Sequence, residues 1–338
     1  MLYENDEKWN EILLKEKNRK VQHSLKFRDV IQDSYSNCVS KYFNDGKSIY
    51  PFFLVKSKIF GNRLISVPFL DVGGFLGKED GKVLDELKKR YSKIEVRLNK
   101  FLENYEEQEK ILLKKGFSKI PSKHQFIIGL SSEEEMWKNF HKHTRNDIRK
   151  AEKSNLKIKK ISGEEIKKFY KLYLQEMKNF GTPQHSKKFF NNLFEKMKEN
   201  VYGLNCYYGN KLIGSIIIVF RGKYGYVMFN VSDRKYRDFR PNDLLYWETI
   251  KWAIDKKIKF IDVGQVDEDA EKGTHAYGLY KFKNKWLGKV YERVYFTIPK
   301  SEEKEKKEKL KKFRKIWSKM PMFLIKIIGP RITREMGI

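Results

Sequence analysis

The sequence predicts an α/β protein with two domains, each a mixed sheet flanked by helices, followed by a basic helical tail. Three observations predict this class. The 338 residues exceed what one ordinary hydrophobic core holds. A hydrophobic content of 40%, with 14% aromatic, is ample for burial. Helical patterns alternate with short apolar runs typical of strands. We place the domains at residues 1–130 and 131–300, and the tail at residues 301–338.

The first domain is predicted to mix helices and strands. Residues 50–55 and 64–67 have the composition of strands, and a glycine-containing turn follows at 71–75. We predict a helix over 81–100 and a closing strand over 124–130. The predicted helix has its apolar side chains on one stripe, made by Leu84, Leu87, Tyr91, Ile94 and Leu98.

The second domain begins at a helix-start signal, because Ser132 and Glu135 form a capping-box pattern. Gly181 is placed to stop a helix over 165–180. Gly209 marks a hairpin, and Pro241 marks the start of another helix. We also predict a helix over 187–198 and strands over 202–208, 212–220, 224–231, 260–263 and 289–298.

Charge is the largest signal in the composition, since 72 Lys and Arg against 44 Asp and Glu give a net charge of +28. Such a charge attracts polyanions, which include RNA, anionic lipid headgroups and nucleotide-linked sugars. The alternative is that lysine decorates every helix surface, because the basic residues are spread along the whole chain. Charge alone leaves the function open.

Composition also limits chemistry and location. Cys38 and Cys206 are too few and too far apart for a disulfide framework or a metal-ligand set, and we predict no metal. The N-terminal residues lack the apolar segment of a secretory signal. No run approaches the roughly 20 apolar residues that cross a bilayer. We therefore expect a cytoplasmic protein.

The tail has a different character from the domains. Residues 301–312 are a lysine and glutamate run, and residues 311–328 are basic and apolar by turns. This amphipathic pattern fits a helix bound at a membrane surface. Packing of the tail against its own domain is the alternative.

Four local patterns occur in one order along the chain. They are Ser66-Val-Pro-Phe-Leu-Asp-Val-Gly-Gly74, Arg145-Asn-Asp-Ile-Arg-Lys-Ala-Glu152, Gly181-Thr-Pro-Gln-His-Ser186, and Phe260-Ile-Asp-Val-Gly264 followed by Gly278-Leu-Tyr-Lys-Phe-Lys283. Together they resemble the FemABX family over about residues 50–290. The resemblance implies two tandem GNAT-like domains and transfer of an acyl or aminoacyl group onto an amine.

The resemblance also implies partners. The best-known members transfer amino acids from aminoacyl-tRNA to a peptidoglycan precursor at the cytoplasmic face of the membrane. This implies an anionic nucleotide- or lipid-linked acceptor in envelope or polysaccharide assembly. Members that use tRNA carry a long helical arm in the second domain, and no such arm is evident here. GNAT proteins that use acetyl-CoA hold its pyrophosphate in a glycine-rich turn. The equivalent residues 237–242 of this chain contain no glycine. The donor stays open between aminoacyl-tRNA and acyl-CoA, and we predict no cofactor.

Lys283 is the predicted catalytic residue, because the family motif places it where a cation can neutralise a developing oxyanion. Its neighbour Lys281 has the same chemistry but is expected to point elsewhere. Asp262, at the end of a buried strand, could accept a proton from the attacking ammonium or orient the amine. The alternatives are a solvated lysine and an aspartate that caps a turn.

The predicted substrate-binding residues come from the same motifs and their surroundings. Each has a structural alternative: a plain turn, an exposed basic face, a structural histidine or core packing. These residues are Asp71, Gly73, Gly74, Arg145, Arg149, Thr182, His185, Asn242, Gly264, Tyr280 and Trp286. A non-catalytic module, a degenerate transferase that binds RNA or anionic membrane through its charge, is the rival function.

Overall fold

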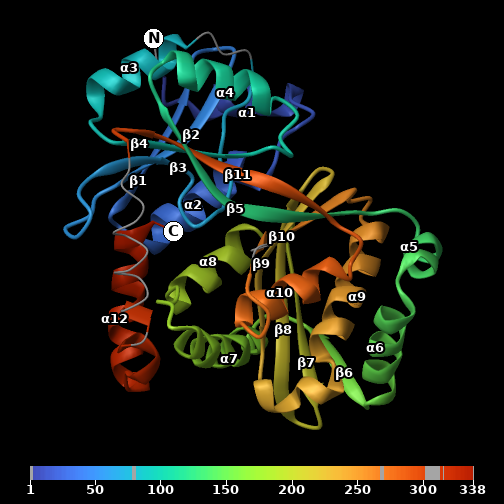
Figure 1. Cartoon of the computed structure of the whole chain (residues 1–338). Coiled ribbons are helices and arrows are strands. Elements are labelled where there is room, and N and C mark those ends of the chain that lie inside the picture. The colour runs from blue at the N-terminus through green and yellow to red at the C-terminus, as the bar shows by residue number, and fades with distance from the viewer. Residues whose placement is uncertain (1–2, 78–80, 267–269, 301–312, 315, 338) are drawn as a thin grey trace. The chain divides into compact units, whose positions relative to one another are not determined.

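The computed structural model describes residues 3–77, 81–266, 270–300, 313–314 and 316–337. It forms two compact units (Figure 1). Unit 1 is Met1–Lys123 together with Tyr291–Ile338, and unit 2 is His124–Val290. The compact units therefore divide the chain at 123 and 290, whereas the sequence analysis placed the boundaries at 130 and 300.

Unit 1 is a mixed sheet with helices packed on it. Its strands are β1 (Cys38–Asn44), β2 (Ile49–Val55), β3 (Arg63–Ser66), β4 (Ile94–Asn99), β11 (Lys289–Ile298) and the first part of β5 (Ser118–Gly129), in the order β1-β2-β3-β4-β11-β5. The pair β3–β4 is parallel, whereas β1–β2, β2–β3 and β4–β11 are antiparallel. Its helices are α1 (Asp6–Lys15), α2 (Leu25–Ser34), α3 (Lys82–Arg90), α4 (Tyr105–Lys114) and α12 (Met322–Met336), with a 3-10 turn at Val21–His23.

The helix predicted over 81–100 is wrong in its second half. Helix α3 ends at Arg90, and Ile94–Asn99 is strand β4 in the interior of the sheet. Ile94 and Leu98 lie four residues apart, a spacing that one face of a helix and one face of a strand share. Val96, equally buried between them, fits only the two-residue period of a strand.

Strand β11 gives a second difference from the sequence analysis. Residues 289–298 form the predicted strand, but its register pairs Arg293–Ile298 with Asn99–Ile94 of β4. A strand expected in the second domain therefore belongs mostly to unit 1. Hydrophobic pattern identifies a strand but carries no information on which partner lies beside it.

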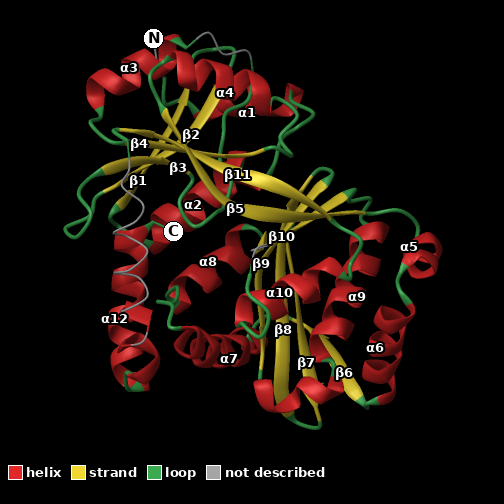
Figure 2. Cartoon of the chain, viewed as in Figure 1, coloured by secondary structure: helices red, strands yellow, loops and turns green. Residues whose placement is uncertain are grey.

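Unit 2 is a mixed sheet covered on both faces (Figure 2). Its strands are the second part of β5, then β10 (Phe260–Val266), β9 (Tyr224–Ser232), β8 (Lys211–Arg221), β7 (Val201–Tyr208) and β6 (Leu156–Lys160), in that order. The helices are α5 (Glu133–Asn139), α6 (Lys142–Lys153), α7 (Glu164–Phe180), α8 (Lys187–Lys196), α9 (Pro241–Asp255) and α10 (His275–Asn284), with a 3-10 segment at Arg234–Phe239. The predicted elements between 165 and 263 occur in the predicted order, whereas strand β6 was not predicted. The predicted fold class is confirmed.

Alternate residues of β8 show which helices cover which face. A Cβ at Gly214 would meet Leu245 and Pro241 of α9. The next side chain, Ser215, donates to Asn205 at 2.6 Å, and Asn205 donates to Glu165 of α7 at 2.8 Å. Successive side chains of a strand point to opposite faces, so α9 and α7 cover opposite faces of the sheet.

The predicted helix signals are present. Ser132 accepts the backbone N–H of Glu135 at 3.2 Å. Gly181 closes α7 in the left-handed conformation with φ of 66°, and Pro241 is the first residue of α9. The single helix expected after Ser132 is interrupted at residues 140–141, which separate α5 from α6.

Candidate active site

Strands β9 and β10 part at the carboxyl end of their parallel pairing. Phe260–Asp262 pair with Tyr224–Tyr226, yet β9 continues to Ser232 and β10 to Val266. Beyond Asp262, β10 keeps antiparallel pairs with β5 at Gln265 and Val266. Ligands of open α/β sheets gather beyond the carboxyl ends of parallel strands. We therefore place the candidate site at the carboxyl end of β10.

A bulge in β10 shapes this end. The register with β5 shifts between Asp262 and Gln265, and Gly264 within the shift has φ of 80°. Asp262 Oδ1 accepts the N–H of Gly264 at 2.8 Å, and Oδ2 accepts Gln125 Nε2 at 2.7 Å. Both carboxylate oxygens thus hold the bulge. The structure supports the turn-capping alternative for Asp262, and its role in proton transfer stays a prediction.

Lys283 reaches the same bulge from α10. The residue is only 7% exposed, and its Nζ donates to the carbonyl oxygen of Gln265 at 2.9 Å. A Cβ at Gly264 would lie 3.5 Å from that Nζ. The ammonium is therefore held over the glycine of the bulge, not solvated on a helix surface. Lys281, two residues earlier, is exposed, as the sequence analysis expected.

Aromatic packing holds α10 against α9. Trp286 is fully buried and stacks on Tyr246 at 5.3 Å between ring centroids. Phe282 meets the same tyrosine edge-on at 5.0 Å. Tyr280 is partly buried against the same core. The structure thus supports core packing, the alternative to ligand stacking, for Trp286.

A buried ion network fixes the end of α10. Lys285 Nζ lies 3.2 Å from Asp147 Oδ2 of α6 and is ion-paired with Asp243 of α9. Arg240 Nε lies 3.2 Å from the other oxygen of Asp147. Burial raises the pKa of Asp243, and Lys285 opposes that shift. Sequence analysis missed these groups, although Asp147 lies inside the quoted Arg145–Glu152 motif.

Arg145 and Arg149 both contact α5. Arg145 Nη1 donates to the carbonyl oxygens of Trp137, Lys138 and Phe140, which end that helix. Arg149 lies over the ring of Trp137, 5.4 Å from its centroid. These contacts fix the break between α5 and α6. Binding of substrate by Arg145 and Arg149 stays a prediction, and the contacts of Arg145 count against it.

His185 lies in an aromatic cluster under α7 and α8. Its ring stacks on Phe189 at 4.3 Å and meets Phe229 of β9 edge-on at 5.6 Å. Burial lowers the pKa of His185 to about 3. The backbone N–H of its neighbour Thr182 bonds to the carbonyl of Met177 and closes α7. Both residues have structural roles, and their predicted contacts with substrate stay predictions.

The neutral state of His185 predicts a pH dependence of stability. An unfolded histidine takes a proton near pH 6.5, whereas the buried one does so only near pH 3. The free energy of unfolding should therefore fall as the pH drops below about 6.5, by about 1.4 kcal/mol one pH unit lower. Urea unfolding of the natural chain and of His185→Phe at pH 7.5 and 5.5 checks this. The phenylalanine variant should lack that part of the fall, and equal falls in both proteins would contradict the assignment.

Glu176 is a buried carboxyl that sequence analysis also missed. It is 3% exposed, and burial raises its pKa while a hydrogen bond from Asn179 at 2.8 Å opposes the shift. Arg234, just beyond the end of β9, lies 3.9 Å away. A carboxyl of raised pKa accepts protons near neutral pH more readily than an ordinary glutamate does. Its sequence signal is its place on the stripe of Phe169 and Tyr173 in α7.

The predicted turn residues of unit 1 form a strained loop. Val67 and Phe69 have φ of 55° and 67°, and a Cβ at Gly73 would collide with Ser66. Gly74 also has positive φ, of 89°. Asp71 is ion-paired with Arg293 of β11, a residue that also contacts Ser122. The loop thus requires its glycines for steric reasons, and ligand contact there stays a prediction.

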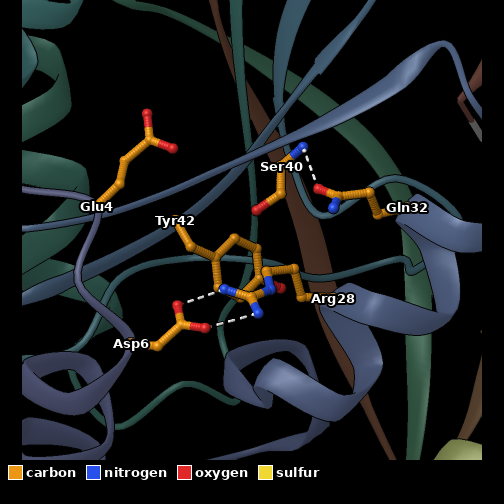
Figure 3. Close-up of a pocket in the computed structure, with 6 residues that line it drawn as sticks. All are labelled: Glu4, Asp6, Arg28, Gln32, Ser40 and Tyr42. Carbon is orange, nitrogen blue, oxygen red and sulfur yellow. Dashed lines mark hydrogen bonds and ion pairs between the residues drawn. The ribbon is translucent and has the colours of Figure 1, made fainter.

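Unit 1 also carries a polar pocket of about 340 Å³ (Figure 3). Arg28, one of its lining residues, is ion-paired with Asp6, and Gln32 accepts the backbone N–H of Ser40. Glu4 is paired with Lys41 at 2.8 Å. These charges are matched within the protein, so the pocket gives no sign of a charged ligand.

The cysteines are buried in different units, and among the described residues both are free thiols. Burial raises the pKa of each thiol, Cys38 and Cys206, to about 12. A nucleophilic cysteine is reactive as the thiolate, so neither residue is suited to covalent catalysis.

Comparisons with known proteins agree with the fold. Residues 138–278 match the family model of an acetyltransferase (GNAT) domain. Lipid II:glycine glycyltransferase of Staphylococcus haemolyticus (strain JCSC1435) is 30% identical over 82 residues, which cover 24% of this chain and 20% of that protein. The chain thus spans about a fifth of the length of the curated relatives it matches.

Solved structures extend the likeness to the whole fold. FemX superimposes with a TM-score of 0.70 and 13% identity, over 88% of this chain and 96% of its own. A tandem GNAT protein from the clavulanic acid biosynthesis pathway gives a TM-score of 0.54 and 11% identity, over 89% of this chain and all of its own (100%). Residues 138–278 are thus similar to a GNAT domain, and the fold is that of tandem GNAT proteins. The resemblance to the FemABX family that the four motifs suggested agrees with these matches.

Proposed function

We propose that the chain transfers an aminoacyl group from aminoacyl-tRNA to an amine of a lipid-linked cell-envelope precursor, at the inner face of the cell membrane. The observation that carries the proposal is the buried ammonium of Lys283 at the bulge of β10. Its setting beyond a parallel strand pair is that of a ligand site. The resemblance to the FemABX family supports the reaction class.

Aminoacyl transfer requires the protein to position the two substrates and to stabilise charge. The acceptor amine attacks the ester carbonyl, its nitrogen loses a proton, and the ribose hydroxyl leaves with a proton. Negative charge builds on the carbonyl oxygen in between, and the Lys283 ammonium stabilises it. We assign the proton of the amine to Asp262, which lies at the same bulge as Lys283. No residue of the chain becomes acylated.

The N-terminus of α9 favours an aminoacyl ester over an acyl-CoA donor. In acetyl-CoA members of the superfamily this end of the helix holds the pyrophosphate. Here the first turn contains the buried carboxylate of Asp243, with Asp147 beside it, and these carboxylates are paired with Lys285 and Arg240. Asn242 bonds to Ser232 and Asn230 of β9. A first turn that already contains a paired carboxylate offers a pyrophosphate less than a bare helix N-terminus does.

The names of the relatives support the proposed acceptor class. The staphylococcal proteins matched over 82 residues are named Lipid II:glycine glycyltransferases, and that name joins an aminoacyl group to a lipid-linked precursor. We extend this class to the present chain, with the amino acid and the precursor unassigned. A lipid-linked acceptor implies that the transfer reaction takes place beside the membrane.

Donor screening tests the proposal. Purified protein is incubated with a lipid-linked muropeptide and either a mixture of radiolabelled aminoacyl-tRNAs or labelled acetyl-CoA. We expect label on the muropeptide from aminoacyl-tRNA, and none from acetyl-CoA. Label from acetyl-CoA alone would favour the N-acyltransferase alternative. Transfer from neither donor to lipid- or nucleotide-linked muropeptides would overturn the proposal.

A further inference from the structure

Helix α12 is anchored to unit 1 at its C-terminal end (red in Figure 1). Arg63 Nη2 donates to the carbonyl oxygens of Glu335 and Met336, both at 2.9 Å. Arg97 Nη2 donates to Gly337 O at 3.0 Å, and Asn37 Nδ2 donates to Arg334 O at 3.0 Å. The last carbonyls of a helix have no partner within it, so these three side chains cap α12. Packing of the tail against its own domain, the alternative in the sequence analysis, thus holds for this end. Residues 301–312 lie outside the described residues.

One face of α12 packs inward and another is exposed. Ile325 is fully buried, and Gly329 and Thr333 follow it at four-residue spacing on the inner face. Phe323 and Ile327, also four apart, are 64% and 54% exposed. The residues flanking them are the exposed Lys326 and Arg331. We call Phe323, Lys326, Ile327 and Arg331 the outer face of α12.

The charge of this helix is of one sign wherever it is exposed. Residues 313–337 contain a single acidic residue, Glu335, which is 9% exposed and accepts the backbone N–H of Lys58 at 2.8 Å. Lys319, Lys326 and Arg331 are exposed basic residues of the same stretch. Large apolar side chains set among cations, with no exposed anion, fit an anionic lipid surface better than a mixed-charge protein surface.

A second exposed apolar element lies at the anchored end. Ile59 and Phe60, in the turn between β2 and β3, are 64% and 43% exposed. Lys58, just before them, bonds to Glu335, and the Arg63 guanidinium lies 5.4 Å from the centre of the Phe60 ring. The loop and the helix end are thus tied together. None of the described helices is long and apolar enough to cross a membrane, so a contact here would lie in the plane of the surface.

We propose that the outer face of α12 binds the surface of an anionic lipid bilayer, with Phe323 and Ile327 inserted among the headgroups and Lys326 and Arg331 on the lipid phosphates. This binding is separate from transfer of the aminoacyl group and needs no donor or acceptor. It would hold unit 1 at the surface where a lipid-linked acceptor lies.

Vesicle sedimentation of the full chain tests the proposal without any activity assay. The vesicles are phosphatidylcholine alone or phosphatidylcholine with a third of phosphatidylglycerol. We expect binding to the anionic vesicles, weakened by salt, and little binding to the neutral ones. Phe323→Glu/Ile327→Glu should weaken binding at least tenfold, and Lys326→Gln/Arg331→Gln by about fivefold per charge.

The matched control is Leu14→Glu/Leu113→Glu, which places the same charges at apolar residues 67% and 47% exposed on α1 and α4. At equal salt this variant should bind vesicles nearly as tightly as the natural chain does. Its two added negative charges should cause only a small loss of affinity. Equal loss in both double variants would overturn the proposal, because it would show only a response to net charge. So would unchanged vesicle binding by the α12 variant. If that variant instead turned a dimer into a monomer in sedimentation velocity while vesicle binding stayed the same, a second copy of the chain would be the occupant.

Discussion

Lys283→Ala should lower kcat for aminoacyl transfer by about 100- to 1000-fold while leaving the fold intact. Loss of one donor aimed at a developing oxyanion costs about 3–4 kcal/mol in the transition state. Lys283 is 7% exposed and its ammonium donates to the carbonyl of Gln265, so the truncated variant has no equivalent positive charge in the same place. Single-turnover rates with saturating donor measure the effect on the chemical step.

Lys281→Ala is the matched control, because this lysine lies two residues away on α10 and is exposed. It removes the same charge from the same helix and should change kcat by less than about twofold. A thermal melt of each variant separates catalysis from unfolding. Full activity of Lys283→Ala would show that its ammonium does not act on the carbonyl. If transfer were absent from the natural chain as well, the rival function, binding of RNA or anionic membrane by a degenerate transferase, would gain.

Lys285→Met should lower the free energy of unfolding by about 3–5 kcal/mol, the usual cost of removing one partner from a buried ion pair. The side chain is 16% exposed and pairs with Asp147 and Asp243, themselves 10% and 5% exposed at the side chain. Without the ammonium Asp147 keeps its ion pair with Arg240, but the two buried carboxylates have lost the cation that they share. Urea denaturation at neutral pH measures the loss.

A triple variant, Lys285→Met with Asp147→Asn and Asp243→Asn, is the test of this explanation. Removing the carboxylates together with the ammonium should recover most of the lost stability, because no uncompensated buried charge remains. If the triple variant were less stable than Lys285→Met alone, packing of the lysine stem rather than charge would explain the effect. Lys281→Met should be close to neutral, since that side chain is exposed.

Local signals in the sequence were sufficient for most elements of unit 2. Ser132, Gly181 and Pro241 are placed at helix ends, where their caps and backbone conformations act within a few residues. Lys283 was predicted through a motif, and the structure brings Gly264 and Lys283 of that motif together at one bulge. The catalytic role of Lys283 stays a prediction. These cases share one property: the physical cause lies close to the residue in the chain or in a known motif.

Long-range partners explain what sequence analysis missed. Ile94 and Leu98 satisfied a helical stripe, and only the neighbouring strands β3 and β11 make their segment a strand. The partners of Lys285 lie 42 and 138 residues away, so no local pattern reveals the network. Glu176 was detectable, because a carboxyl among Phe169 and Tyr173 on the inner stripe of a helix needs an explanation.

Unit 2 is an insertion within unit 1, and this has a consequence for biosynthesis. The chain leaves unit 1 along β5 and returns along β11, the strand that lies between β4 and β5 in the sheet. A ribosome that has released residues 1–123 has therefore not yet supplied an interior strand of that unit, whereas 124–290 emerge as one uninterrupted piece. Unit 2 can therefore complete its hydrogen bonding first. The sheet of unit 1 lacks β11 until the final segment is synthesised, and until then the edges of β4 and β5 that pair with β11 are unpaired.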